Sequence, residues 1–101
     1  MNAGLVPTAT AVDGEMTIYR AAELKAQLLQ ALERAGPVLE LDLSGVTEID
    51  IAGLQLLQML KAEAAQSART LQLVCVSVPV HELLSLLELV DHFGPPALVL
   101  S

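Results

Sequence analysis

Two carboxylates near the middle of the sequence are the residues best placed to do chemistry. Asp42 ends an alternating apolar stretch, and Asp50 precedes Ile51, Ala52 and Gly53 at the start of a helical pattern. A pair of carboxylates near one strand end could bind a cation or act as general acid and base. In the simpler interpretation, Asp50 caps the helix and Asp42 sits at the strand terminus. An enzyme that uses both is the weakest of three hypotheses, and we expect no catalytic residue.

The histidines and the cysteine match no common catalytic or metal-binding spacing. His81 and Glu82 are adjacent, and His92 follows eleven residues after His81, which fits no helical zinc motif and indicates surface histidines. Cys75 lies in the apolar run 71–76, where burial raises the pKa of a thiol and makes a structural role the expected one. A single cysteine cannot form an internal disulfide, which indicates a reducing compartment. We expect neither a metal nor a cofactor.

Length and composition restrict the class of protein. The 101 residues predict one domain, 1–101, that buries roughly two thirds of its unfolded surface. Apolar residues make up 53% of the chain and charged residues 17%, so the chain must fold compactly. A net charge of −7 disfavours nucleic acid and anionic membrane surfaces as partners. The N-terminal residues show no basic segment followed by an apolar stretch, and no uninterrupted apolar run approaches ~18 residues. We therefore expect a cytoplasmic protein with no membrane insertion.

Hydrophobic periodicity predicts alternating strands and helices. Asp13 and Gly14 resemble a two-residue turn and predict an N-terminal hairpin. Ser44 and Gly45 are expected to end the central strand. The C-terminal stretch 97–100 is either an edge strand or a docked tail. The expected elements are hairpin arms 8–12 and 15–19, helix 21–35, strand 38–43, helix 52–65, strand 71–76, parallel to the preceding strand, and helix 79–89.

A helical wheel of the second helix separates a buried side from an exposed side. The residues expected to face the sheet are Ala52, Gly53, Leu56, Leu57, Met59, Leu60 and Ala64. Gln55 and Gln58 share the opposite side, onto which Ile51 projects, and Leu54 lies at the margin of the core. The first turn would then display two aliphatic side chains among uncharged glutamines, as in a protein contact surface. Alternatively, Ile51 folds down and covers the loop.

The central segment resembles the STAS domain, which occurs in bacterial anti-sigma factor antagonists and in the tails of sulfate transporters. The matching residues are Asp42, Leu43, Ser44, Gly45, Val46, Ile49, Asp50, Gly53 and Leu54. The resemblance implies an α/β fold with a mixed sheet of about four to five strands, an N-terminal hairpin followed by parallel strands, and helices mainly on one side. It also implies protein binding without catalysis, with Asp42, Ser44, Gly45 and Gly53 as the structural motif.

Phosphorylatable members of that family carry serine or threonine immediately before the motif glycine, a position that Ala52 occupies here. A phosphate there would meet free backbone amides and add about two negative charges to a binding surface. Ala52 cannot accept phosphate, so we expect no phosphorylation switch at this motif. Ser44 and Thr47 keep hydroxyl groups nearby, but hydrogen bonding within the turn and loop is their expected role.

The leading hypothesis is a stand-alone bacterial signalling domain, anti-sigma antagonist-like or chemotaxis-type, that binds a signalling kinase or an anti-sigma-like protein. The alternative is the small STAS accessory subunit of a lipid-transporting ABC transporter, which binds the ATPase subunit. A homodimer is compatible with either. The expected partner-binding residues are Glu48, Asp50, Ile51, Ala52, Leu54, Gln55 and Gln58.

Overall fold

The computed structural model of the chain describes residues 9–94, 96 and 98–100. Strands and helices alternate through most of this range. None of the helices in it is long and apolar enough to cross a membrane. The elements are β1 (Thr10–Met16), α1 (Ala21–Arg34), β2 (Val38–Ile49), α2 (Ile51–Gln66), β3 (Thr70–Ser77), α3 (Val78–Leu86), α4 (Val90–Phe93) and β4 (Leu98–Leu100).

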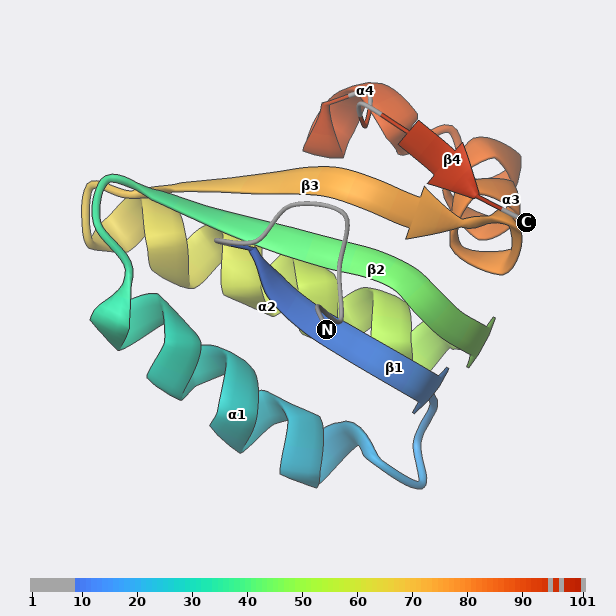
Figure 1. Ribbon diagram of the computed structural model, residues 1–101, viewed down its shortest axis with the longest axis horizontal. Coiled ribbons are helices and arrows are strands. Elements are labelled where there is room, and N and C mark those ends of the chain that lie inside the picture. The colour runs from blue at the N-terminus through green and yellow to red at the C-terminus, as the bar shows by residue number, and fades with distance from the viewer. Residues whose placement is uncertain (1–8, 95, 97, 101) are drawn as a thin grey trace.

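The strands form one sheet in the order β1-β2-β3-β4, and every pairing among the described residues is parallel. Three of the strands are long, and the three-residue β4 extends the sheet beyond β3 (Figure 1). The expected α/β fold is therefore present, but the expected mixed sheet with its N-terminal hairpin is wrong. Each pair of neighbouring strands is joined through helical segments, as parallel pairing requires.

The expected hairpin is a single strand, because Asp13 and Gly14 lie inside β1 instead of forming a turn. Gly14 has a φ of +81° beside an irregularity in the pairing of β1 with β2. The Arg20 guanidinium donates to the carbonyl oxygens of Asp13 (2.7 Å) and Glu15 (2.9 Å), on either side of Gly14. The glycine that predicted a turn therefore supplies the positive φ of a kink within a strand. Thr8, in the first expected arm, lies outside the described residues.

Strand β2 continues to Ile49, six residues beyond the expected end at 43, and includes Ser44 and Gly45. Between the pairs Ala11–Asp42 and Asp13–Gly45, β2 advances three residues while β1 advances two. Such a bulge shifts the side-chain alternation by one residue, and a second irregularity follows before Glu48. The predicted strand was too short because the alternation of side chains with a period of two is interrupted at each bulge.

The other elements agree with the sequence except near the C-terminus. Helices α1 and α2 and strand β3 match their expected ranges within one residue at each end. The third helix ends at Leu86, and a separate short helix, α4, follows. Residues 98–100 pair with β3, which decides for an edge strand, while Ala97 lies outside the described residues.

One aliphatic core joins the helices to one side of the sheet. Leu24 of α1, Leu57 of α2, Leu84 of α3 and Phe93 of α4 all belong to it, so the helices pack mainly on one side, as expected. Figure 1 shows α2 lying behind β2, with its first turn at the end where β1 and β2 finish. The core therefore fixes the start of α2 beside the ends of two strands.

Candidate functional site

Asp50 joins three segments at the start of α2. One carboxylate oxygen accepts a hydrogen bond from the Gly53 amide (3.0 Å), and the other accepts one from the Ile18 amide (3.0 Å). The Asp50 amide donates to the Met16 carbonyl oxygen (3.2 Å). The predicted N-cap is confirmed, and Asp50 also holds the loop that follows β1. These backbone hydrogen bonds, first that of Ile18 and then that of Gly53, lower the pKa of the Asp50 carboxyl below its usual range.

Gly53 lies where the first turn of α2 crosses the end of β1. A Cβ atom at this position would overlap the Met16 carbonyl oxygen and press on the Ile49 side chain. Glycine at this position of the motif therefore has a packing cause, since only a bare backbone can approach the strand so closely. The approach helps to hold the first turn in a fixed position.

Exposed apolar residues lie at this first turn and in the loop that Asp50 holds beside it. We define the apolar patch as Ile18, Tyr19 and Ile51, whose residue surfaces are 64%, 90% and 53% exposed. Ile18 and Ile51 are brought together because Asp50, which precedes Ile51, binds the Ile18 amide. Ile51 thus projects outward, and the alternative that it folds over the loop is wrong. Exposed apolar side chains on a well-anchored backbone are typical of protein contact sites.

The other expected surface residues differ in exposure. Leu54 is only 5% exposed and belongs to the core, so the expected exposed pair of Ile51 and Leu54 is wrong. The helix turns its Leu54 side inward because the first turn is drawn against β1 at Gly53. The glutamines Gln55 and Gln58 are exposed, as is Glu48 at the end of β2.

A shallow hollow between α1 and α2 adjoins the apolar patch. Its volume is about 300 Å³. Ala52, which is half-buried, lies on its wall together with Ile18. The remaining lining residues are Ala21, Ala22, Lys25, Gln55, Leu56 and Met59. A partner that covers the patch could insert a small apolar group here.

The second carboxylate, Asp42, lies in the middle of β2 and not at its terminus, which corrects that expectation. It is 1% exposed, and one of its oxygens accepts hydrogen bonds from the Ser44 amide (2.9 Å) and hydroxyl (2.6 Å). Asp50 follows Ile49 at the far end of this strand, which at about 3.3 Å per residue places it up to roughly 26 Å from Asp42. The fold therefore separates the two carboxylates that could have formed an acid–base pair.

Cys75 pairs with Asp42 across β2 and β3 and is buried. Desolvation raises the pKa of the Cys75 thiol, and the nearby Asp42 charge raises it further, while the polar side chain of Ser44 lowers it in part. A buried thiol with a raised pKa is a poor nucleophile. The structural role expected for Cys75 agrees with this environment.

Ile18 and Tyr19 were missed by sequence reasoning because the expected hairpin placed them in its second arm. A parallel arrangement of β1 and β2 would have located them, since the carboxyl ends of parallel strands meet at one edge of a sheet. The available signal was the pair of adjacent large apolar residues directly after Thr17, before the helix that begins at Ala21.

Comparisons with known proteins agree on one family. The family model described as "Mlab, STAS domain" matches residues 5–99. The crystal structure of a sulfate transporter family protein from Wolinella succinogenes is similar, with a TM-score of 0.71 and 21% identity over 90% of this chain and 74% of that one. A SulP transporter STAS domain from Vibrio cholerae has a TM-score of 0.59 and 18% identity over 88% and 69%. No curated protein sequence matches. At these identities the two solved structures support the fold alone.

Proposed function

The chain belongs to the STAS domain family, and from that premise we propose that it is a non-catalytic docking module that binds a protein partner through the apolar patch. STAS domains are protein-interaction modules. The observation that carries the proposal is the patch itself, in which Ile18, Tyr19 and Ile51 stand exposed beside the structural motif. A few residues supply most of the binding free energy in protein interfaces, and tyrosine is among the residue types enriched there.

The surroundings of the patch support a contact surface with few charges at its centre. Ala52 and Gln55 follow Ile51 on α2, and Glu48 stands near the end of β2. Arg20, which follows Tyr19, is paired with Glu23. Asp50 is charged, but both of its oxygens are already engaged by backbone amides. Depletion of charge at the centre and polar groups at the rim are features of protein interfaces.

Partner binding is proposed to be independent of phosphorylation at the motif. The position that carries the phosphoacceptor in related domains is Ala52, which has no hydroxyl. The Ser44 hydroxyl already donates to the buried Asp42 carboxylate, which reduces its availability to a kinase. The affinity of the apolar patch for its partner would then be constant, whereas a phosphorylated domain would change its affinity as phosphate is added or removed.

The first candidate partner is a bacterial signalling protein, either a kinase or an anti-sigma-like protein. The second is the ATPase subunit of a lipid-transporting ABC transporter, because that class of transporter contains a small STAS subunit that does not need the phosphoacceptor. The name Mlab carried by the matching family model favours this second candidate. In both cases the partner would cover Ile18, Tyr19 and Ile51.

The substitution Ile51→Asp tests the docking surface, because it places a charge in the patch without touching the core. We expect at least about a tenfold loss of partner capture from native lysate, with unchanged thermal unfolding. Leu86→Asp, in the 78% exposed Leu86 of α3, is the matched control and should bind normally. Equal capture by Ile51→Asp and wild type would refute the surface. The captured protein, identified by mass spectrometry, separates signalling proteins from an ATPase subunit.

The absence of a switch is tested by incubation with an anti-sigma-type serine kinase. Mass spectrometry should find no phosphate within residues 44–54 of the wild-type chain. The Ala52→Ser variant is the positive control, since it restores a hydroxyl at the motif. Detection of phospho-Ser44 or phospho-Thr47 in cells would contradict the proposal that the domain is not switched.

A further inference from the structure

A positively lined hollow of about 390 Å³ lies beside the second half of α2. Lys61 of α2, Arg69 before β3, and His92 of α4 all border it. The chain has only five lysines and arginines against twelve acidic residues, and two of those five meet here. In a protein with a net charge of −7, such a concentration of positive charge marks this hollow off from the rest of the surface.

The cations in this hollow are free to bind a ligand. Lys61 and Arg69 are both half-buried, and within the described part of the chain neither lies within 4.0 Å of a carboxylate oxygen. The hollow's described lining contains no aspartate or glutamate. Arg69 also borders a neighbouring hollow lined by Glu33 and Glu63, but it forms an ion pair with neither.

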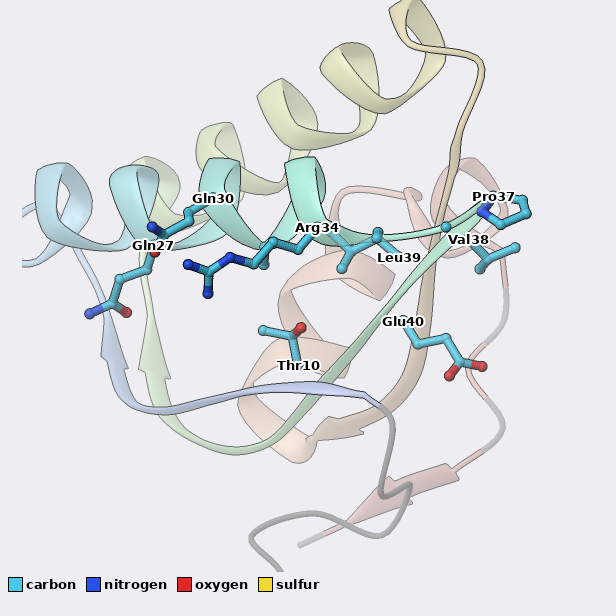
Figure 2. A pocket seen from close by; sticks show the side chains of 11 residues that line it. Thr10, Gln27, Gln30, Arg34, Pro37, Val38, Leu39 and Glu40 are labelled. Carbon is cyan, nitrogen blue, oxygen red and sulfur yellow. The ribbon is translucent and has the colours of Figure 1, made fainter.

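A second hollow on the same molecule provides a contrast. It measures about 690 Å³ and lies at the end of α1 and the start of β2. Figure 2 shows the Arg34 side chain reaching along α1 toward Gln27, while Glu40 of β2 also lines the space. One guanidinium and one carboxylate give this hollow no excess of positive charge. The hollow at Lys61 and Arg69 therefore stands out by charge, although it is smaller.

We propose that the hollow at Lys61, Arg69 and His92 binds the phosphate group of a small molecule or a lipid headgroup. Arginine and lysine form charge-assisted hydrogen bonds to phosphate oxygens, and the side chains of Gln58 and Thr70 add polar donors at the same lining. The remaining lining residues are Ala62, Ala65 and Leu71, whose apolar surface can receive the rest of the ligand. The volume lies within the range of small-molecule sites.

The site is tested by titrating the folded, isotope-labelled chain with inorganic phosphate and following its amide resonances at low salt. Saturable shifts are expected around residues 58–71 and 91–93. Lys61→Gln and Arg69→Gln should each weaken binding about tenfold, as loss of one charge-assisted contact predicts. Arg34→Gln is the matched control and should bind like wild type. Thermal unfolding verifies that each variant is folded.

Further ligands identify the source of the phosphate. Glycerol 3-phosphate represents a soluble metabolite, and phosphatidylcholine vesicles containing phosphatidic acid represent a lipid headgroup. Saturable binding of either one that Arg69→Gln weakens supports the site. Shifts that never saturate, an equal loss in Arg34→Gln, or tighter binding of a polyglutamate peptide would overturn it, the last because it indicates a protein contact. Ile51→Asp should leave phosphate binding intact, so the site and the docking surface can fail separately.

Discussion

The two ends of helix α2 differ in how well their residues suit the backbone. The first turn carries a glycine at a position where a side chain would not fit. Just beyond the last turn, an alanine adopts a positive φ that a glycine would adopt without strain. Gly53 faces the Met16 carbonyl oxygen, and Ala68 has a φ of 57°. The first turn is positioned by tertiary contacts with β1. The far end is closed by its own backbone, through hydrogen bonds from Ser67 to Ala64 (3.1 Å) and from Arg69 to Ala64 (2.7 Å).

This difference corresponds to the two surfaces proposed for α2. The apolar patch rests on the end that neighbouring segments fix in place, so its side chains are held ready for a large partner. The cations Lys61 and Arg69 lie toward the other end, whose closing hydrogen bonds from Ser67 and Arg69 are local, although Leu60 and Ala64 also pack in the core. Two long side chains can adjust their rotamers to bind a small ligand. A large protein partner binds more tightly to a backbone that is already held in position, because less ordering is needed on binding.

The largest expected effect is at the fixed end, in Gly53→Ala. The added methyl overlaps the backbone of β1, which cannot move without disturbing the sheet, so we expect a loss of about 2 to 3 kcal/mol in the free energy of unfolding. Chemical denaturation measures it. Gly36→Ala is the control, since no atom lies within 4 Å of its Cβ position. Equal tolerance of both substitutions would show that α2 is not fixed at Gly53.

A smaller loss is expected for Asp50→Ala, which removes the cap of α2 and the anchor of the loop at Ile18. The loss should be accompanied by faster hydrogen exchange at the Ile18 and Gly53 amides, measured by NMR. Asp13→Ala, in an exposed aspartate of β1, serves as the control. If exchange at Ile18 were unchanged in Asp50→Ala, the loop would be held by other contacts.

At the C-terminal end of α2, a substitution should instead raise the free energy of unfolding. Ala68→Gly relieves a positive φ but adds freedom to the unfolded chain, and we expect a net gain of about 0.5 kcal/mol. Ala62→Gly, in the exposed helix interior, should instead lose about 1 kcal/mol. Paired thermal unfolding curves distinguish the two. A loss in both variants would mean that Ala68 is not under strain.

The smallest effect concerns pH. The folded pKa of Asp50 lies below its unfolded value, so its charge stabilises the fold above the unfolded pKa, and this contribution disappears as pH falls through the folded pKa. The stability difference between wild type and Asp50→Asn should therefore be constant near neutrality and shrink below about pH 4. Unfolding measured across this range tests the sign. A difference that widens toward acid would contradict it.

The sequence predicted the helices and strands that are determined by residues close together in the chain. The alternation and helical periodicity of α1, α2 and β3 are continuous, and Asp50 is a cap recognisable from its residue type and position. The full length of β2 was not predictable by this means, because its bulges depend on pairing with β1. The positive φ of Gly14 is equally consistent with a turn and with a kinked strand, and only the parallel neighbour decides between them.

Only part of the proposed docking surface was predictable, for the same reason. Ile51 follows from the helical wheel, since it lies on the polar side of α2. Ile18 and Tyr19 depend on how β1 lies beside β2, a fact that spans the chain. Leu54 was misplaced because the wheel does not include the close approach of the first turn to Met16 at Gly53.

The hydrogen bond between Ile18 and Asp50 spans 32 residues of sequence. Closing so long a segment costs chain entropy before any contact repays it, and parallel pairing of β1 with β2 must accompany it. Until β1 and β2 have paired and this hydrogen bond has formed, nothing holds Ile18 beside Ile51, so the apolar patch is assembled by folding. A partner that recognises both residues would bind only finished copies of the domain, and its binding would report that folding is complete.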